Sequence, residues 1–189
     1  AALVRRSLAE ASGLVDYSYA RPSRRQGCAG RVLLPSLRRP VPRVAVIVDT
    51  SGSMTNAMLA VALAEIRGIL AAAGLRDGLA VLSVDAAVNA NQRVTRAESV
   101  RLTGGGGTDM SVGLAAAERL TPRPEVVVVV TDGYTPWPDH PPHGMRTVVV
   151  KTEAGGTSPS WARAVLVTPD QHNSLAQEGI TRARFASGH

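Results

Sequence analysis

The sequence is poor in cysteine, aromatic side chains and long apolar runs, and each shortage excludes a class of protein. Cys28 is the only cysteine in 189 residues, so the chain cannot form an intramolecular disulfide or a Cys-rich zinc site. Aromatic residues make up 3% of the chain, too few for a base-stacking platform on single-stranded nucleic acid. The valine run Val126 to Val130 is far shorter than the ~18 apolar residues of a membrane-spanning helix. We therefore expect a cytoplasmic protein without a membrane span.

Lysine is nearly absent, and positive charge is distributed unevenly along the chain. Lys151 is the only lysine, so arginine carries almost all of the positive charge behind the net value of +6. The first 43 residues contain nine arginines against Glu10 and Asp16, which leaves the remainder close to neutral. A basic arm of this kind is a candidate nucleic-acid contact. We keep nucleic-acid binding as an alternative, although the arm has only Tyr17 and Tyr19 as aromatic residues to support it.

The length and the 44% hydrophobic content fit one domain with one core, because a chain of this size can bury roughly 70% of its unfolded surface. Residues 1–15 place apolar side chains at helical spacing. Residues 16–42 are rich in Arg, Pro and Ser, which excludes a long helix and predicts an extended segment. We therefore divide the chain into an N-terminal helix with a basic extended lead-in, 1–42, and a domain, 43–189.

Beyond this boundary, apolar strands and helical segments alternate. Continuous apolar runs predict strands that are buried on both faces, and Ala- and Leu-rich stretches with one apolar stripe predict helices. We expect strands at 43–49, 79–84, 125–131, 146–151 and 162–167, a short edge strand or hairpin piece within 92–101, and helices at 56–73 and 109–120. Such alternation predicts an α/β fold with a doubly wound, mostly parallel sheet and helices on both faces.

Three polar motifs are expected at one edge of this sheet. They read DTSGSM at 49–54, GGGGTD at 104–109 and TDG at 131–133. In open α/β sheets, ligands bind beyond the carboxyl ends of the strands. The motifs supply two carboxylates and three hydroxyls, an all-oxygen set that suits Mg²⁺, with Mn²⁺ or Ca²⁺ as alternatives, and does not suit zinc. The predicted metal-binding residues are Asp49, Ser51, Ser53, Thr108 and Asp132.

The order Asp-x-Ser-x-Ser, then a Thr after a Gly-rich loop, then an Asp after a later strand resembles the metal-ion-dependent adhesion site of von Willebrand factor A (VWA) domains. With RPSRR at 21–25, LPSL at 34–37 and TDGYTPWP at 131–138, the chain looks like the C-terminal VWA-like domain of a bacterial metallopeptidase-like family. The resemblance implies a Rossmann-like VWA fold. The zinc motif HExxH of that family is absent from this sequence, so peptidase activity is not carried over.

The resemblance also implies how the metal would be held and used. Ser51, Ser53 and Thr108 would bind it directly, and Asp49 and Asp132 would act mainly through water. Such a cation keeps an open position for an Asp or Glu from a partner protein. Related VWA proteins act with MoxR-type AAA+ ATPases, which implies a non-enzymatic adaptor in a bacterial chaperone or remodelling system. The alternative is the non-catalytic C-terminal part of a metallopeptidase.

Competing motif interpretations fail on particular residues. No lysine follows GGGGTD, although a phosphate-binding Walker loop requires one. A phosphatase of the haloacid-dehalogenase type would need a second acid where the chain has Ser51. The chain has no G-x-S-x-G motif for a serine hydrolase. His140 and His143 lie in a Pro-rich loop that cannot present them at helical i, i+4 spacing.

Five further residues have two interpretations each. Asp85 is either an acid that supports the metal site or an ordinary loop carboxylate, and Asp109 either orients Thr108 or caps a helix. Met54 either lines the rim of the site or belongs to the core. Trp137 and Trp161 either anchor a partner or cover the sheet edge, and we favour the second role.

Overall fold

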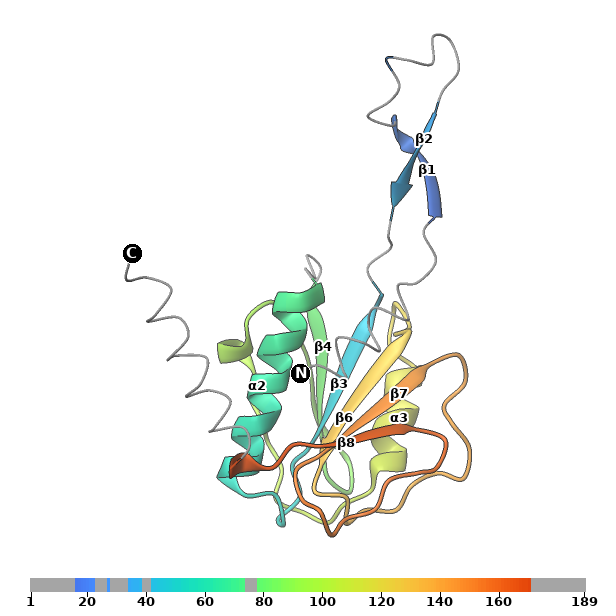
Figure 1. The fold of residues 1–189 in the computed structure, drawn as a ribbon. Coiled ribbons are helices and arrows are strands. Elements are labelled where there is room, and N and C mark those ends of the chain that lie inside the picture. The colour runs from blue at the N-terminus through green and yellow to red at the C-terminus, as the bar shows by residue number, and fades with distance from the viewer. Residues whose placement is uncertain (1–15, 23–26, 28–33, 39–41, 74–77, 171–189) are drawn as a thin grey trace, which may run out of the picture.

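The computed structural model describes residues 16–22, 27, 34–38, 42–73 and 78–170. Figure 1 shows these elements in chain order: β1 (Asp16–Pro22), β2 (Pro35–Arg38), β3 (Val44–Asp49), α2 (Asn56–Ala73), β4 (Leu79–Val84), β5 (Val88–Val94), the 3-10 turn η2 (Ala97–Ser99), α3 (Met110–Glu118), β6 (Val126–Thr131), β7 (Arg146–Lys151) and β8 (Arg163–Leu166). β1 and β2 form a two-stranded sheet, and the other six strands form the main sheet.

The main sheet has the strand order β5-β4-β3-β6-β7-β8. Five of its strands are parallel, and β5 alone runs antiparallel at one edge. β3, β4 and β6 are buried along their whole lengths, as strands covered on both faces must be. The chain adds β4 on one side of β3 and β6 on the other. The carboxyl ends of β3 and β6 therefore lie at the switch point where α/β sheets form a binding crevice.

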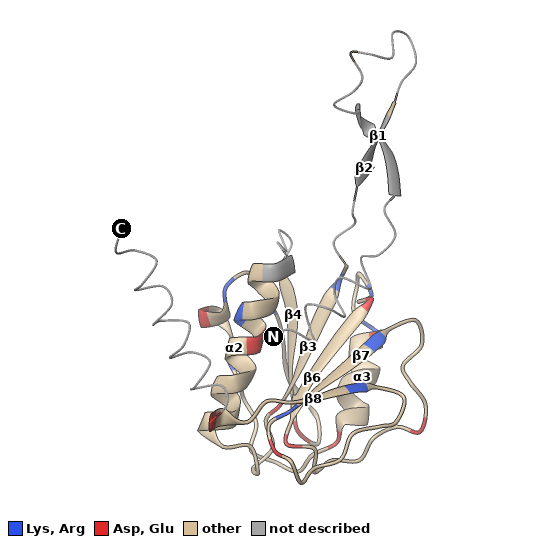
Figure 2. Cartoon of the chain, in the orientation of Figure 1, with Lys and Arg blue, Asp and Glu red and all other residues tan. Residues whose placement is uncertain are grey.

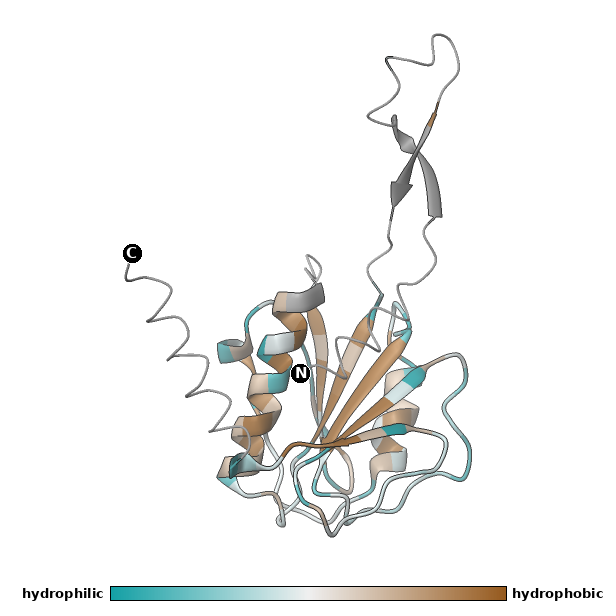
Figure 3. Ribbon diagram, in the orientation of Figure 1, coloured by the Kyte–Doolittle hydropathy of each residue, from teal (hydrophilic) through white to brown (hydrophobic). Residues whose placement is uncertain are grey.

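Of the helices in the described residues, α2 covers one face of the sheet and α3 covers the other (Figure 1). Val46 and Val48 of β3 join the cluster that contains α2, whereas Ile47 between them joins the cluster that contains α3. Each such fully buried aliphatic side chain contributes about 1.5–3 kcal/mol. Figure 3 shows the apolar strands as the brown centre of the domain. No helix among the described residues is long and apolar enough to span a membrane. The predicted α/β fold with helices on both faces is confirmed.

Two loops take the place of helices beside β7 and β8. The connections 132–145 and 152–162 contain no helix, so the expected alternation of strand and helix stops after β6. Trp137 and Trp161 pack from these loops against the cluster on the α3 face. The indole N–H of Trp161 donates to the carbonyl of Pro138 at 3.0 Å, which joins the two loops. The tryptophans therefore cover the sheet, the role that the sequence favoured.

The structure corrects the bounds of one predicted strand and adds a pair of strands in the lead-in. An edge strand is present, but it spans Val88–Val94 and overlaps the predicted segment 92–101 only at its end, and 97–99 forms the turn η2. Alternating partial burial along β5 explains the error, because its polar residues Asn89, Asn91 and Arg93 face solvent and hide the apolar pattern. The lead-in, predicted to be extended, contains the antiparallel pair β1 and β2. The helix expected at 1–15 lies outside the described residues.

Candidate metal centre

Two carboxylates lie at the carboxyl ends of neighbouring parallel strands. Asp49 is the last residue of β3, and Asp132 follows Thr131, the last residue of β6. The two strands pair in register, Val48 opposite Val130. Asp49 is fully buried and Asp132 is 1% exposed. Figure 2 shows acidic positions in red among the loops at this end of the sheet.

Both carboxylate oxygens of Asp49 have hydrogen-bond donors. Oδ1 accepts the backbone N–H of Ser51 at 3.0 Å, and Oδ2 accepts the hydroxyl of Thr131 at 2.6 Å. Burial raises the pKa of Asp49 above its usual value and is the largest influence; the hydrogen bonds from Thr131 and Ser51 lower it, and the charge of Asp132 raises it again. The two hydrogen bonds fix the orientation of the Asp49 carboxylate at the end of β3.

The two serines of the DTSGSM motif bring their hydroxyls together. Ser51 Oγ and Ser53 Oγ lie 3.2 Å apart. Ser51 is buried and Ser53 is exposed, so the pair runs from the interior to the surface. The carbonyl of Ser51 accepts the N–H of Met54 at 3.1 Å, which closes a tight turn around both hydroxyls. The hydroxyls of Ser51 and Ser53 therefore turn toward one point.

Asp132 supplies an oxygen that no described group satisfies. Its Oδ1 accepts the N–H of Tyr134 at 3.0 Å. Its Oδ2 is buried and has no hydrogen-bond partner among the described residues. An unsatisfied buried polar atom costs about 1–3 kcal/mol, and more when it is charged. Native structures contain few such atoms, so this oxygen points to a ligand that the protein itself does not supply.

The glycine-rich loop lies directly against the DTSGSM loop. The N–H of Gly52 donates to the carbonyl of Gly106 at 3.2 Å, and the hydroxyl of Thr50 donates to the carbonyl of Thr103 at 2.9 Å. At Gly104 a Cβ would lie 2.2 Å from Thr50 Oγ1, so only glycine fits there. Thr108 follows this loop and is half-buried. The chain therefore delivers Thr108 to the same end of the sheet as the serines and acids.

Several neighbouring residues have structural roles. Asp109 accepts the N–H of Ser111 at 2.9 Å and caps α3, which decides between its two interpretations. Met54 is 7% exposed and accepts a contact from the Thr152 hydroxyl at 3.9 Å, so it belongs to the interior. Sequence reasoning missed Thr131, which donates to Asp49. A hydroxyl at the end of a valine run was the available signal.

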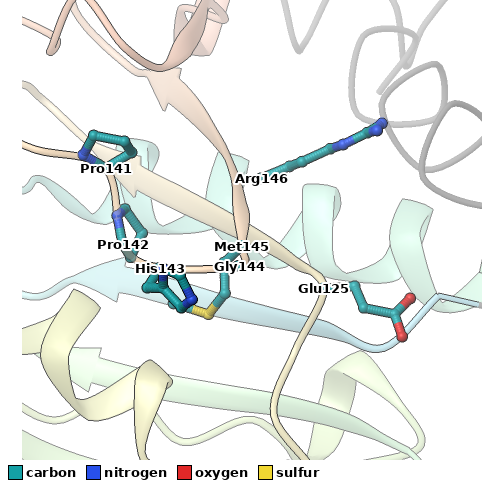
Figure 4. A pocket seen from close by; sticks show the side chains of 7 residues that line it. All are labelled: Glu125, Pro141, Pro142, His143, Gly144, Met145 and Arg146. Atoms are coloured by element: carbon teal, nitrogen blue, oxygen red, sulfur yellow. The ribbon is translucent and has the colours of Figure 1, made fainter.

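Acidic and histidine side chains elsewhere in the described residues do not form a second cluster of metal ligands. The described part of the chain contains no group of three His, Cys, Asp or Glu that could hold a metal. An open hollow of about 580 Å³ is present elsewhere in the domain. Its lining residues, drawn in Figure 4, are Glu125, Pro141, Pro142, His143, Gly144, Met145 and Arg146. Arg146 begins β7 and Glu125 precedes β6, so this hollow lies at the amino end of the sheet. It is remote from Asp49 and Asp132.

Comparisons with known proteins bear on the family. An uncharacterised protein of Thermotoga maritima is 35% identical over 108 residues, which are 56% of this chain and 26% of that protein. The chain thus matches about a quarter of that relative's length. The crystal structure of the Deinococcus radiodurans RO (RSR) protein superposes with a TM-score of 0.46 and 20% identity over 68% of this chain and 31% of that one. Residues 44–168 match the family described as VWA-like domain (DUF2201). Because this match spans more than half of the chain, the chain belongs to the family of VWA-like domains.

Proposed function

We propose that the domain is a non-enzymatic protein-binding module whose docking site is a divalent cation, Mg²⁺ in the first instance. Asp49, Ser51, Ser53, Thr108 and Asp132 would hold the ion. When bound, the cation supplies an electrophilic position that a carboxylate from another protein can fill. The observation that carries the proposal is the buried Oδ2 of Asp132, which has no hydrogen-bond partner in the described part of the chain and lies at the same sheet edge as the buried Asp49.

The donor set supports Mg²⁺ or Mn²⁺ with modest affinity. All five residues offer oxygen, the donor that these hard cations take. Three are neutral hydroxyls, and the two acids are held by hydrogen bonds from Ser51, Thr131 and Tyr134. Burial is the main cause that raises the pKa of Asp49 and the charge of Asp132 adds to it, so a cation between the two carboxylates would offset both effects.

The proposed partner is a protein that presents an Asp or Glu, specifically a MoxR-type AAA+ ATPase or one of its clients. This part of the proposal rests on the resemblance to VWA proteins that work with such ATPases, and it places the module in the bacterial cytoplasm. Pull-down of the ATPase by the full chain tests it. Binding should require Mg²⁺, should fail in EDTA, and should fail with Thr108→Ala or Asp132→Ala while both variants stay folded.

The outcome that would contradict this proposal is a complex that survives EDTA and both substitutions. If that complex dissociates when the arginines at 24, 25, 38 and 39 are neutralised, the basic arm is the interaction surface instead.

A second proposal concerns the whole protein. Because the chain matches only about a quarter of its Thermotoga relative, the domain is also a candidate for the non-catalytic end of a longer metallopeptidase. A native gene that encodes HExxH upstream would support that origin.

A further inference from the structure

We infer that Asp85 is a positioning residue of the proposed metal centre: its carboxylate and its backbone carbonyl hold the glycine-rich loop that places Gly52 and Thr108. The inference rests on the proposed function and extends it to a residue outside the predicted ligand set. The sequence left Asp85 between a supporting acid and an ordinary loop carboxylate. Its contacts favour the first interpretation.

Asp85 follows β4 directly, and both of its carboxylate oxygens accept backbone hydrogen bonds. Oδ1 accepts the N–H of Ala87 at 2.9 Å, which closes the turn into β5. Oδ2 accepts the N–H of Gly106 at 3.2 Å, across to the glycine-rich loop. The N–H of Ala87 is the main group that lowers the pKa of Asp85, so the carboxylate is ionised at neutral pH. A charged acceptor makes these bonds stronger than neutral ones.

The backbone of Gly106 connects Asp85 to the predicted ligands. Its N–H donates to Asp85, and its carbonyl accepts the N–H of Gly52 at 3.2 Å. Gly52 stands between Ser51 and Ser53 in the chain. A Cβ at Gly106 would lie 3.0 Å from Asp85 Oδ2, a tight contact that the carboxylate could accommodate only by shifting away from Gly106. The Asp85 carboxylate thus holds a residue whose backbone carbonyl contacts the loop that carries Ser51 and Ser53.

The backbone of Asp85 makes a second contact on the other side of Thr108. The carbonyl of Asp85 accepts the N–H of Asp109 at 3.0 Å. Thr108 therefore lies between two points, Gly106 and Asp109, that are both held by Asp85. Four consecutive glycines lose much conformational entropy when they are fixed, so the loop must obtain its conformation from contacts outside itself. Asp85 supplies those contacts in advance of metal binding.

The test is Mn²⁺ affinity of the full chain, measured by titration calorimetry on wild type, Asp85→Asn and Gly106→Ala. In Asp85→Asn the side chain keeps only one oxygen, so it can accept a hydrogen bond from the N–H of Ala87 or of Gly106 but not from both. One of the two contacts is therefore lost. Substitutions of groups that orient metal ligands cost 10- to 100-fold in affinity, and we expect about tenfold weaker binding. Gly106→Ala should also weaken binding, because it disturbs the same contact without a change of charge. Glu153→Gln removes an exposed acid from the β7–β8 loop and is the matched control.

The loss should persist at high salt, because it comes from loop geometry and not from a screened charge. Melting temperatures of the variants show whether each one folds; if Asp85→Asn does not, Gly106→Ala carries the test. Binding within threefold of wild type for a folded Asp85→Asn or Gly106→Ala would overturn the inference while leaving the proposed metal site in place. Absence of Mn²⁺ binding by the folded wild type would overturn both.

Discussion

Charged side chains are exposed at the amino end of the main sheet and buried at its carboxyl end. At the amino end, Arg43 pairs with Glu125 at 2.7 Å and Arg123 with Glu118 at 3.5 Å, and all four side chains keep a third or more of their surface in water. At the carboxyl end, Asp49 and Asp132 are buried. Exposed ion pairs change the free energy of unfolding little, whereas the burial of an acid lowers it through lost hydration. The carboxyl end is therefore built at a cost in stability that a structural role alone does not explain.

The largest effect is expected from Asp132→Asn at the carboxyl end. The substitution keeps the shape of the side chain but removes the charge from the unpartnered oxygen. We expect Mg²⁺ affinity to fall by about 10- to 100-fold, while the free energy of unfolding in EDTA stays equal or rises. Calorimetry and urea denaturation measure the two quantities. A variant that loses stability and keeps the metal would show that Asp132 is a structural residue.

Two glycines of one loop provide the next comparison. At Gly104 a Cβ would meet Thr50 at 2.2 Å, whereas at Gly107 the nearest atom would be Ala86 Cβ at 3.9 Å. Gly104→Ala should therefore lower the free energy of unfolding by about 1–3 kcal/mol through overpacking. Gly107→Ala should have little effect. Equal losses in both variants by urea denaturation would mean that loop entropy, and not the contact with Thr50, matters here.

The buried Asp49 should give a characteristic pH dependence in the metal-free protein. Because the pKa of Asp49 is raised above its usual 3.8, the folded state binds more protons than the unfolded state just above that pH. The free energy of unfolding therefore falls as pH rises from 3.8 to the raised value, and this contribution disappears in Asp49→Asn. The pKa of Glu98 is lowered from 4.5 by its own backbone N–H and by Arg67. Its contribution to the free energy of unfolding should therefore rise, not fall, as the pH rises toward 4.5. Urea denaturation in EDTA between about pH 3 and 7 tests both; identical slopes in wild type and Asp49→Asn would contradict the assignment.

The smallest effect belongs to the amino end. Glu125→Gln breaks the exposed pair with Arg43 and should cost no more than about 1 kcal/mol. Mg²⁺ affinity should not change, because the pair lies at the other end of the sheet. A clear loss of metal binding in this variant would show that the two ends are coupled.

Local patterns were sufficient to predict the centre of the fold but not its connections. β3 and β6 are short apolar runs that end in Asp49 and Thr131, so their burial and their polar ends could be predicted from adjacent residues alone. The bounds of β5 were missed because every second side chain from Asn89 to Arg93 is exposed and interrupts the apolar pattern. The hydrogen bond from Thr131 to Asp49 joins residues 82 positions apart. The contact between Asp85 and Gly106 likewise depends on which loops cross, and no local pattern contains that information.

The most direct test of the metal centre is an anomalous difference map from crystals of the full chain grown with Mn²⁺. The proposed function predicts one peak among the hydroxyls of Ser51, Ser53 and Thr108, with the carboxylates of Asp49 and Asp132 around it, and no peak in crystals of Asp132→Asn. A well-diffracting wild-type crystal with no peak there, or with its only peak at the hollow near His143 and Glu125, would contradict it.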